Sequence, residues 1–295
     1  MQIGRKVPIN FERYFLSAAI LGILVILYAP LIIHWYHGWL HKNTISIEHE
    51  YFSHGLIGLP FAAYISWTHW QRWRNLPDTT HPLGAILLLL GGIFYLSGVS
   101  DLVNLSFPAI LTGLCLWFKG IPGFRLQSFP LLLVLLASPN SIPYLLVPYT
   151  FPLQQFIAGT AGFILNQLGL AVTVKQINLE INRQVVEVAP FCAGLKMLFT
   201  SLYVSLMLLY WTGAWVSRQK TILLLVGAVI VSIMGNIIRN TLLTYFHGTG
   251  QEHAFEWLHE GWGGDLYSVC MLGVIMLLLN VIDNYFTEEE ESLNS

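Results

Sequence analysis

Runs of about twenty apolar residues recur along this chain of 295 residues, and they constrain its fold more than any other feature. A helix of about 20 apolar residues crosses the hydrocarbon core of a bilayer. Hydrophobic residues make up 55% of the chain and charged residues only 10%, which is too few to cover a water-facing surface. The sequence therefore predicts an all-α integral membrane protein, with residues 1–295 forming a single polytopic domain. Eight spans are expected, at residues 14–33, 55–70, 83–100, 103–118, 128–147, 191–212, 221–245 and 266–285.

The distribution of basic residues predicts the orientation, because loops rich in Lys and Arg stay cytoplasmic. Basic residues precede the first span and occupy alternate loops, so both termini are expected inside. The acidic tail at residues 286–295 would then be cytoplasmic. The loops that carry this argument contain Arg72 and Arg74, Lys119 and Arg125, and Arg218 and Lys220. The expected location is the inner membrane of a bacterial cell.

Residues 151–170 form the one apolar stretch that this count does not accept as a span, and residues 151–189 are expected to form an outer interfacial helix and a hairpin. If residues 151–170 crossed the membrane, Arg218 and Lys220 would lie outside. This stretch is therefore interpreted as an outer interfacial helix or a re-entrant segment. In residues 171–188, β-branched residues alternate with polar ones, and Asn182 and Arg183 stand near the expected turn. The alternation predicts a small β-hairpin at the outer surface.

Three reactive side chains are expected near the outer membrane face, although they come from three separate segments. Cys192 opens the sixth span, at a helix N-terminus that favours a thiolate. Arg239 lies in the outer half of the seventh span, with Asn236 on the same helical face. His259 lies in the loop that follows and precedes a glycine-rich turn, for which reason it is preferred over His253 as the base. A thiolate, a histidine and an arginine together can carry out acyl transfer.

The residues just described resemble those of the exosortase and archaeosortase family of membrane transpeptidases. The resemblance rests on Cys192-Ala193-Gly194, on the pair Asn236 and Arg239, and on His259 with Gly263 four residues later. Residues 51–55, Tyr-Phe-Ser-His-Gly, also look like the Tyr-Ser-His-Gly segment of that family, here with Phe52 inserted.

The resemblance implies a membrane cysteine protease and transpeptidase. Its substrates would be secreted proteins with a C-terminal sorting motif, such as Pro-Glu-Pro, followed by a transmembrane tail and a basic end. A thioester on Cys192 would transfer the new C-terminus to an amine or lipid acceptor. His259 would be the general acid/base and Arg239 the transition-state stabiliser, with Asn236, His54, Ser53 and Glu187 binding substrate or supporting the site. No cofactor and no metal are implied.

Two alternatives remain open at this point. His34, His37, His41, His49 and His54 crowd the first outer loop and would suit a metal or haem redox protein, although an interfacial aromatic belt explains them as well. A transporter would use Arg239 and Asp101 along its pathway.

Other function classes fit the sequence poorly. The formal net charge is −2 and gives no basic surface for nucleic acid. Three cysteines form no disulfide framework, and Cys115 and Cys270 are interpreted as small apolar fillers.

Overall fold

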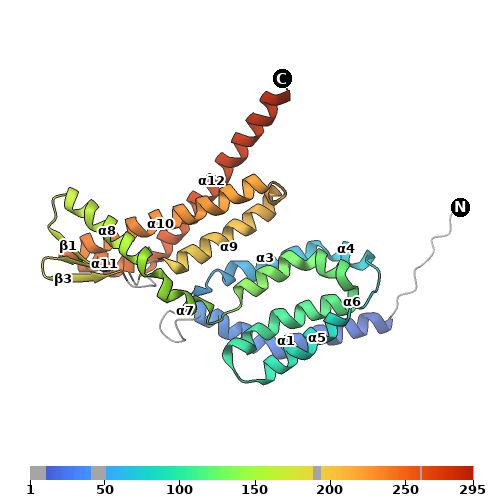
Figure 1. Cartoon of the computed structure of the whole chain (residues 1–295). Coiled ribbons are helices and arrows are strands. Elements are labelled where there is room, and N and C mark those ends of the chain that lie inside the picture. The colour runs from blue at the N-terminus through green and yellow to red at the C-terminus, as the bar shows by residue number, and fades with distance from the viewer. Residues whose placement is uncertain (1–10, 41–50, 189–193, 260, 295) are drawn as a thin grey trace.

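The computed structural model describes residues 11–40, 51–188, 194–259 and 261–294. Within these ranges the chain is mostly helical, with one small sheet (Figure 1). The helices are α1 (Phe11–Leu40), α3 (Gly55–Thr68), α4 (Trp70–Asn75), α5 (Pro82–Leu96), α6 (Ser100–Ala137), α7 (Ile142–Leu146), α8 (Phe151–Gln167), α9 (Leu195–Thr212), α10 (Arg218–Gly248), α11 (Glu252–His259) and α12 (Trp262–Asn294). The 3-10 turns η1 (Val147–Thr150) and η2 (Ala214–Val216) follow α7 and α9.

Five of the described helices are long and apolar enough to cross a membrane: α1 over Ala19–Leu40, α6, α9, α10, and α12 over Trp262–Phe286. Helices α3 and α5 are shorter and also apolar. The long helix α6 is broken at Gly120, where φ is 58° and ψ is −151°. With α6 counted as two limbs, the described apolar helices number eight, and the predicted class of multi-span helical membrane protein is confirmed.

The two limbs of α6 run in opposite directions. Near its start, Asn104 accepts a hydrogen bond from the indole of Trp35, and near its end the carbonyl of Leu136 meets the ring of His54. Both contacts lie near the start of α3, at the end of the helices that also carries the sheet (Figure 1). We call this the sheet end. The kink at Gly120, α4 and η2 lie at the opposite end.

The second limb of α6 ends earlier than the sequence suggests, because the expected span at 128–147 contains prolines that stop the helix. Ser138 is the C-cap and has extended backbone angles, as expected for a residue before proline. Pro143 then opens the separate short helix α7.

The sheet has three antiparallel strands where a two-stranded hairpin is predicted: β1 (Val172–Lys175), β2 (Asn178–Ile181) and β3 (Gln184–Glu187). The expected turn at Asn182 and Arg183 is present, and both residues have positive φ, as this tight hairpin turn requires. A second turn begins at Gln176, with φ of 58°, and adds β1. Because this turn contains no Gly, Pro or Asn, the sequence carries no usual signal for it.

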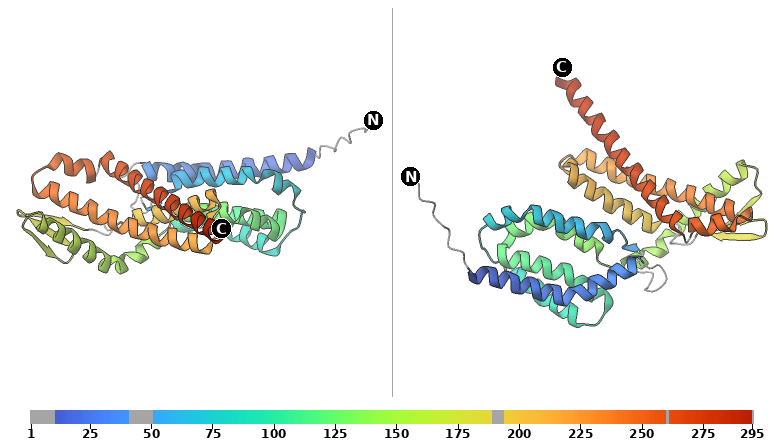
Figure 2. Two further views of the ribbon diagram at one scale, coloured as in Figure 1. Left: turned by 90° about the horizontal axis from the view of Figure 1, so that it is seen from above. Right: turned by 180° about the vertical axis from the view of Figure 1, so that it is seen from behind.

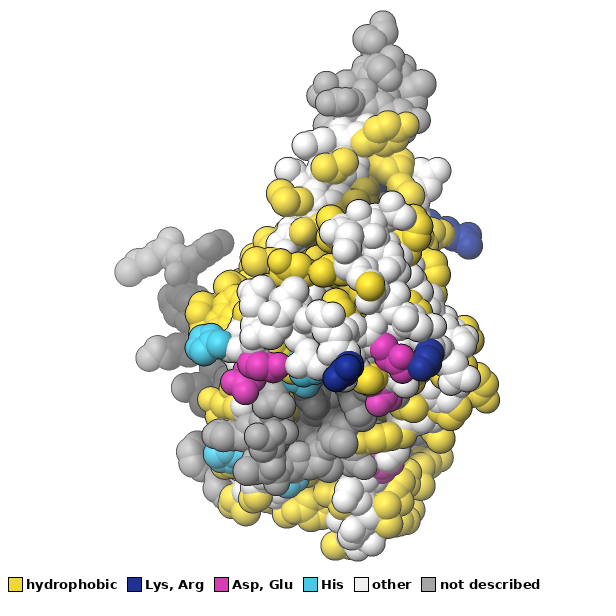
Figure 3. Space-filling view, turned by 90° about the vertical axis from the view of Figure 1, so that its left-hand side faces the viewer, with side chains coloured by type: hydrophobic (Ala, Val, Ile, Leu, Met, Phe, Trp, Pro, Cys, Tyr) yellow, Lys and Arg dark blue, Asp and Glu magenta, His cyan; other side chains and the backbone are white. Residues whose placement is uncertain are grey.

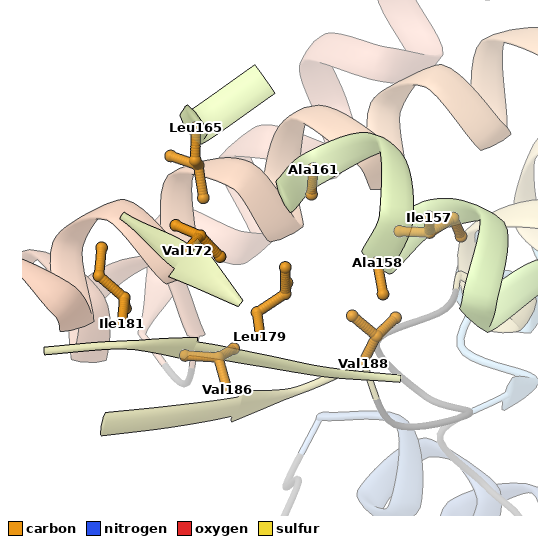
Figure 4. Close-up of a cluster of buried hydrophobic side chains, with 9 residues drawn as sticks. All are labelled: Ile157, Ala158, Ala161, Leu165, Val172, Leu179, Ile181, Val186 and Val188. Atoms are coloured by element: carbon orange, nitrogen blue, oxygen red, sulfur yellow. The ribbon is translucent and has the colours of Figure 1, made fainter. Parts of the chain in front are cut away.

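Helix α8 packs against the sheet and α10, away from the helices of the first half (Figures 1 and 4). One face of α8 contributes Ile157, Ala158, Ala161 and Leu165 to a buried core. The strands add Val172, Leu179, Ile181 and Val186, and Val188 directly after β3 completes it. This core packs α8 and the sheet together beside α10.

The helices form two groups that lie side by side (Figure 2). Helices α1, α3, α5 and α6 make the first group, and α9, α10 and α12 make the second. Tyr203 of α9 connects them by donating a hydrogen bond to the Leu133 carbonyl of α6, 2.9 Å away. The last turns of α12 project beyond the other helices.

Candidate active site

Arg239 and His259 meet at the sheet end. Arg239 is half-buried on α10, and its Nη2 donates to the backbone carbonyl of His259 at 3.5 Å, the long limit of a hydrogen bond. The Nε of Arg239 is buried and has no hydrogen-bond partner among the described residues. Arg239 therefore retains a donor for a further acceptor.

Glycines at the junction of α11 and α12 allow this approach: Gly261 lies between the two helices, and Gly263 and Gly264 lie in the first turn of α12. A Cβ on Gly263 would lie 2.5 Å from the ring of Trp257, and one on Gly261 would lie 2.7 Å from the Trp257 carbonyl. Gly264 lies beside Arg239, whose Nη2 would be 3.6 Å from an added Cβ. The close turn expected from these glycines is thus present, and it holds the end of α11 over Arg239.

His259 lines a small cavity of about 120 Å³ at this end. Glu187 of β3 and Asn240 of α10 line it too, and its apolar wall is formed by Val185, Val186, Leu243 and Phe255. The ring of Phe255 stacks on that of His259, with ring centroids 5.1 Å apart. The cavity therefore brings β3, α10 and α11 together around an imidazole, an amide and a carboxyl group.

Asn236 connects α10 to the start of α9. Gly194, the N-cap of α9, has φ of 86°, and a Cβ on it would lie only 1.6 Å from Asn236 Nδ2. Asn236 also donates to the Ser232 carbonyl at 2.8 Å. Cys192 lies outside the described residues and precedes Gly194 by two positions in the sequence.

His54 and Ser53 lie away from this cavity. His54 is buried at the start of α3, where its Nε2 lies 3.1 Å from the Leu136 carbonyl and its ring packs on Tyr203. Burial lowers the pKa of His54 to about 4, so its imidazole is neutral at physiological pH. Ser53 is half-buried and its carbonyl accepts the Leu56 N–H. Their neighbours Tyr51 and Phe52 pack in one apolar cluster with Leu195 at the start of α9.

The other described residues suggested by the sequence do not line this cavity. His253 is exposed and does not line the cavity. Asp101 accepts the N–H of Ser141 at 3.3 Å, which holds the loop after α6. In the described part of the chain, no three His, Cys, Asp or Glu residues are grouped so as to hold a metal; His41 and His49 fall outside it.

Two residues of this region escaped the sequence interpretation. Asn240 follows Asn236 by one turn, and its Nδ2 donates to the Asn236 carbonyl at 2.8 Å. Because Asn236 and Asn240 are four positions apart, they share one face of the helix, and this spacing could have indicated Asn240 from the sequence. Tyr267 of α12 donates to the Gly235 carbonyl at 2.6 Å, a contact that no sequence pattern predicts.

The surface of the sheet end carries acidic, basic and histidine side chains close together, whereas hydrophobic side chains cover much of the flanks below and above it (Figure 3). Lys175 and Glu180 form one ion pair there, at 2.9 Å, and His247 and Glu252 approach to 3.4 Å. Polar side chains thus gather at one end of an apolar body.

Comparison with models of protein families identifies a matching family. The family model described as transmembrane exosortase, of the EpsH type, matches residues 35–276. No curated protein and no solved structure matches. The matched range contains every candidate site residue, from Ser53 to His259.

Proposed function

This chain belongs to the transmembrane exosortase family, whose members are transpeptidases, and we propose that it cleaves C-terminal sorting tails of secreted proteins through a thioester on Cys192. The acceptor of the new C-terminus would be an amine or a lipid. The family implies substrates of the PEP-CTERM type.

One observation carries this proposal. Asn236 packs directly on Gly194, while Arg239, three residues later on α10, contacts the carbonyl of His259. Three parts of the candidate site therefore meet at α10. They are the segment that follows Cys192, Arg239 itself, and His259 at the end of α11. Neither a redox protein nor a transporter requires that convergence.

In the proposed chemistry, the Cys192 thiolate attacks the scissile carbonyl, and an oxyanion forms. Arg239 stabilises the oxyanion with its free Nε and its charge, in a site partly shielded from water. As the peptide C–N bond breaks, His259 gives a proton to the leaving amine and the thioester remains. The acceptor then loses its proton to His259 and attacks the thioester, and the thiolate leaves.

Supporting roles follow from the contacts. Asn236 would hold the start of α9 against α10, and Glu187 and Asn240 would orient His259 or a substrate group in the cavity. Because His54 is neutral and hydrogen-bonded to Leu136, we assign it to positioning of the α3 start, with Ser53, and not to proton transfer.

We further propose that the sheet end faces the outside of the cell. Arg72, Arg74 and Lys119 lie at the opposite end, in or beside α4 and the kink of α6, and the positive-inside rule assigns that end to the cytoplasm. A secreted substrate with a membrane tail would then present its motif at the site.

The proposal is tested by co-expressing a secreted protein that carries such a tail and following its processing by gel shift. The native enzyme should produce the shift, whereas Cys192→Ala and Arg239→Ala should lose it. Cys270→Ala is the control, because Cys270 is exposed on α12, and it should process normally. An unchanged shift in Cys192→Ala at equal membrane levels would remove the nucleophile and reject the mechanism.

A further inference from the structure

A long groove lies in the half of the molecule that does not carry the candidate catalytic residues. It has a volume of about 1210 Å³ and is lined mainly by apolar side chains of α1, α3 and both limbs of α6. Helix α1 is attached to α6 by the Trp35–Asn104 and Tyr28–Ser106 hydrogen bonds.

The groove extends through the depth of a bilayer. Its lining on α1 runs from Ile20 to Trp39, which corresponds to about 29 Å along a helix and matches the ~30 Å thickness of the hydrocarbon core. On the other side it runs from Gly55 at the sheet end to Trp73 and Lys119 at the opposite end. A lipid acyl chain reaches through one leaflet only, so this depth favours a transmembrane helix as the occupant.

The α3 wall of the groove has the composition of a helix-packing face. Its small residues are Gly55, Ala62, Ala63 and Ser66, and small residues of this kind let helix backbones approach closely inside membranes. Trp39 covers Gly55, and Ala62 is buried, so Ala63 and Ser66 are the ones left open to the groove. Ala63 is exposed, so nothing in the described chain covers this part of the face.

Two buried polar atoms on the groove lining have no partner among the described residues. They are Nε1 of Trp39 and Oε1 of Gln127, and each side chain is only 8% exposed. Unpaired polar groups are costly in an apolar setting, and in membranes such groups hydrogen-bond across helix interfaces. Both atoms are enclosed by the protein, so an occupant of the groove reaches them only after the side chains around them move.

The sheet end of the groove meets the start of α9. Trp39, which lines the groove, packs in the same cluster as Tyr51, Phe52 and Leu195. Leu195 follows Cys192 by three positions. A helix in the groove would therefore emerge beside the segment that carries the candidate nucleophile.

From these observations we infer that the groove between α1, α3 and α6 is the docking site for the membrane helix of the substrate's sorting tail. This inference rests on the proposed function. In this arrangement the first half of the chain binds the membrane tail of the substrate, and the second half binds the peptide that reacts.

Photocrosslinking tests the inference. Benzoylphenylalanine is placed at Ala63 or Leu111 in the groove, and at Leu89 or Ile230 as controls on α5 and α10 outside it. In the Cys192→Ala enzyme, co-expressed with the tail-bearing protein, we expect adducts with that protein from the two groove positions and not from the controls. Adducts from the control positions, or lipid adducts alone from the groove, would overturn the inference.

A pair of matched substitutions distinguishes a failure of the docking site from a failure of the proposed function. Ala63→Trp should fill the groove and reduce processing at least about tenfold, whereas Leu89→Trp, on an exposed face of α5, should leave it unchanged. If the native enzyme processes no tail-bearing protein, the proposed function fails. If the native enzyme processes the tail but Ala63→Trp does so equally well, only the docking site fails.

Discussion

At the scale of single residues, burial distinguishes histidines that the sequence alone treats as alike. His54 is enclosed and neutral, and His253 is exposed. His259 lines the small cavity, and its backbone carbonyl accepts from Arg239. A proton shuttle needs access to the reacting groups, and among these three histidines only His259 lies next to the other candidate residues.

This difference predicts opposite effects for two substitutions. His259→Ala should reduce tail processing on the order of 100-fold or more, the usual effect of removing a general acid/base, while His253→Ala should process at the native rate. Initial rates from the gel-shift assay, at equal enzyme levels, would measure both. Loss of activity in His253→Ala alone would move the base to that residue.

Gly194 provides a second residue-scale prediction. Both Gly194 and Gly213 cap α9 with positive φ, but only Gly194 is crowded, by Asn236. Alanine at either position should cost about 1–2 kcal/mol of backbone strain, and at Gly194 it must also displace Asn236. Gly194→Ala should therefore reduce processing on the order of 100-fold, and Gly213→Ala should keep it. Thermal stability in detergent would show that both variants are folded. Equal processing rates in the two variants would then show that the contact with Asn236 has no part in the reaction.

At the scale of elements, the apolar runs predicted the helices well because helix length and hydropathy are local properties. The second limb of α6 was misplaced because Pro139 and Pro143 end the helix that the apolar run would continue. The third strand was missed because Gln176 adopts positive φ without a turn residue to indicate it. Both outcomes depend on backbone conformation more than on hydrophobicity.

The tight turn at the junction of α11 and the start of α12 positions His259 near Arg239. In Gly263→Ala the new methyl group would overlap the Trp257 ring and push α11 away from α12, which would separate His259 from Arg239. Processing should fall at least about tenfold, with normal membrane insertion. Gly273→Ala is the matched control on α12, since its added Cβ meets nothing within 4 Å, and it should retain full activity. Native rates in Gly263→Ala would mean that the site does not require this turn.

At the scale of the whole molecule, the sequence suggested the separate residues of the candidate site but not how the segments around them pack. The order of Cys192, Arg239 and His259 suggested a shared membrane face, but the packing of Gly194 on Asn236 and the approach of β3 to α10 arise from contacts between distant segments. The groove in the first half had no sequence signal, because its lining residues are apolar like those of any span.

The proposed orientation of the chain is the last condition of the proposed mechanism. A secreted tail reaches the cavity only if the sheet end lies outside, so a membrane-impermeant maleimide should label Arg183→Cys in intact cells, in a background with Cys192→Ala. Asn75→Cys, at the opposite end, should be labelled only after permeabilisation; both positions are exposed. Labelling of Asn75→Cys alone in intact cells would place the cavity in the cytoplasm, where the proposed substrate has no motif to present. The expected pattern would instead put the groove's sheet end, the start of α9 and His259 on the side from which a secreted protein approaches.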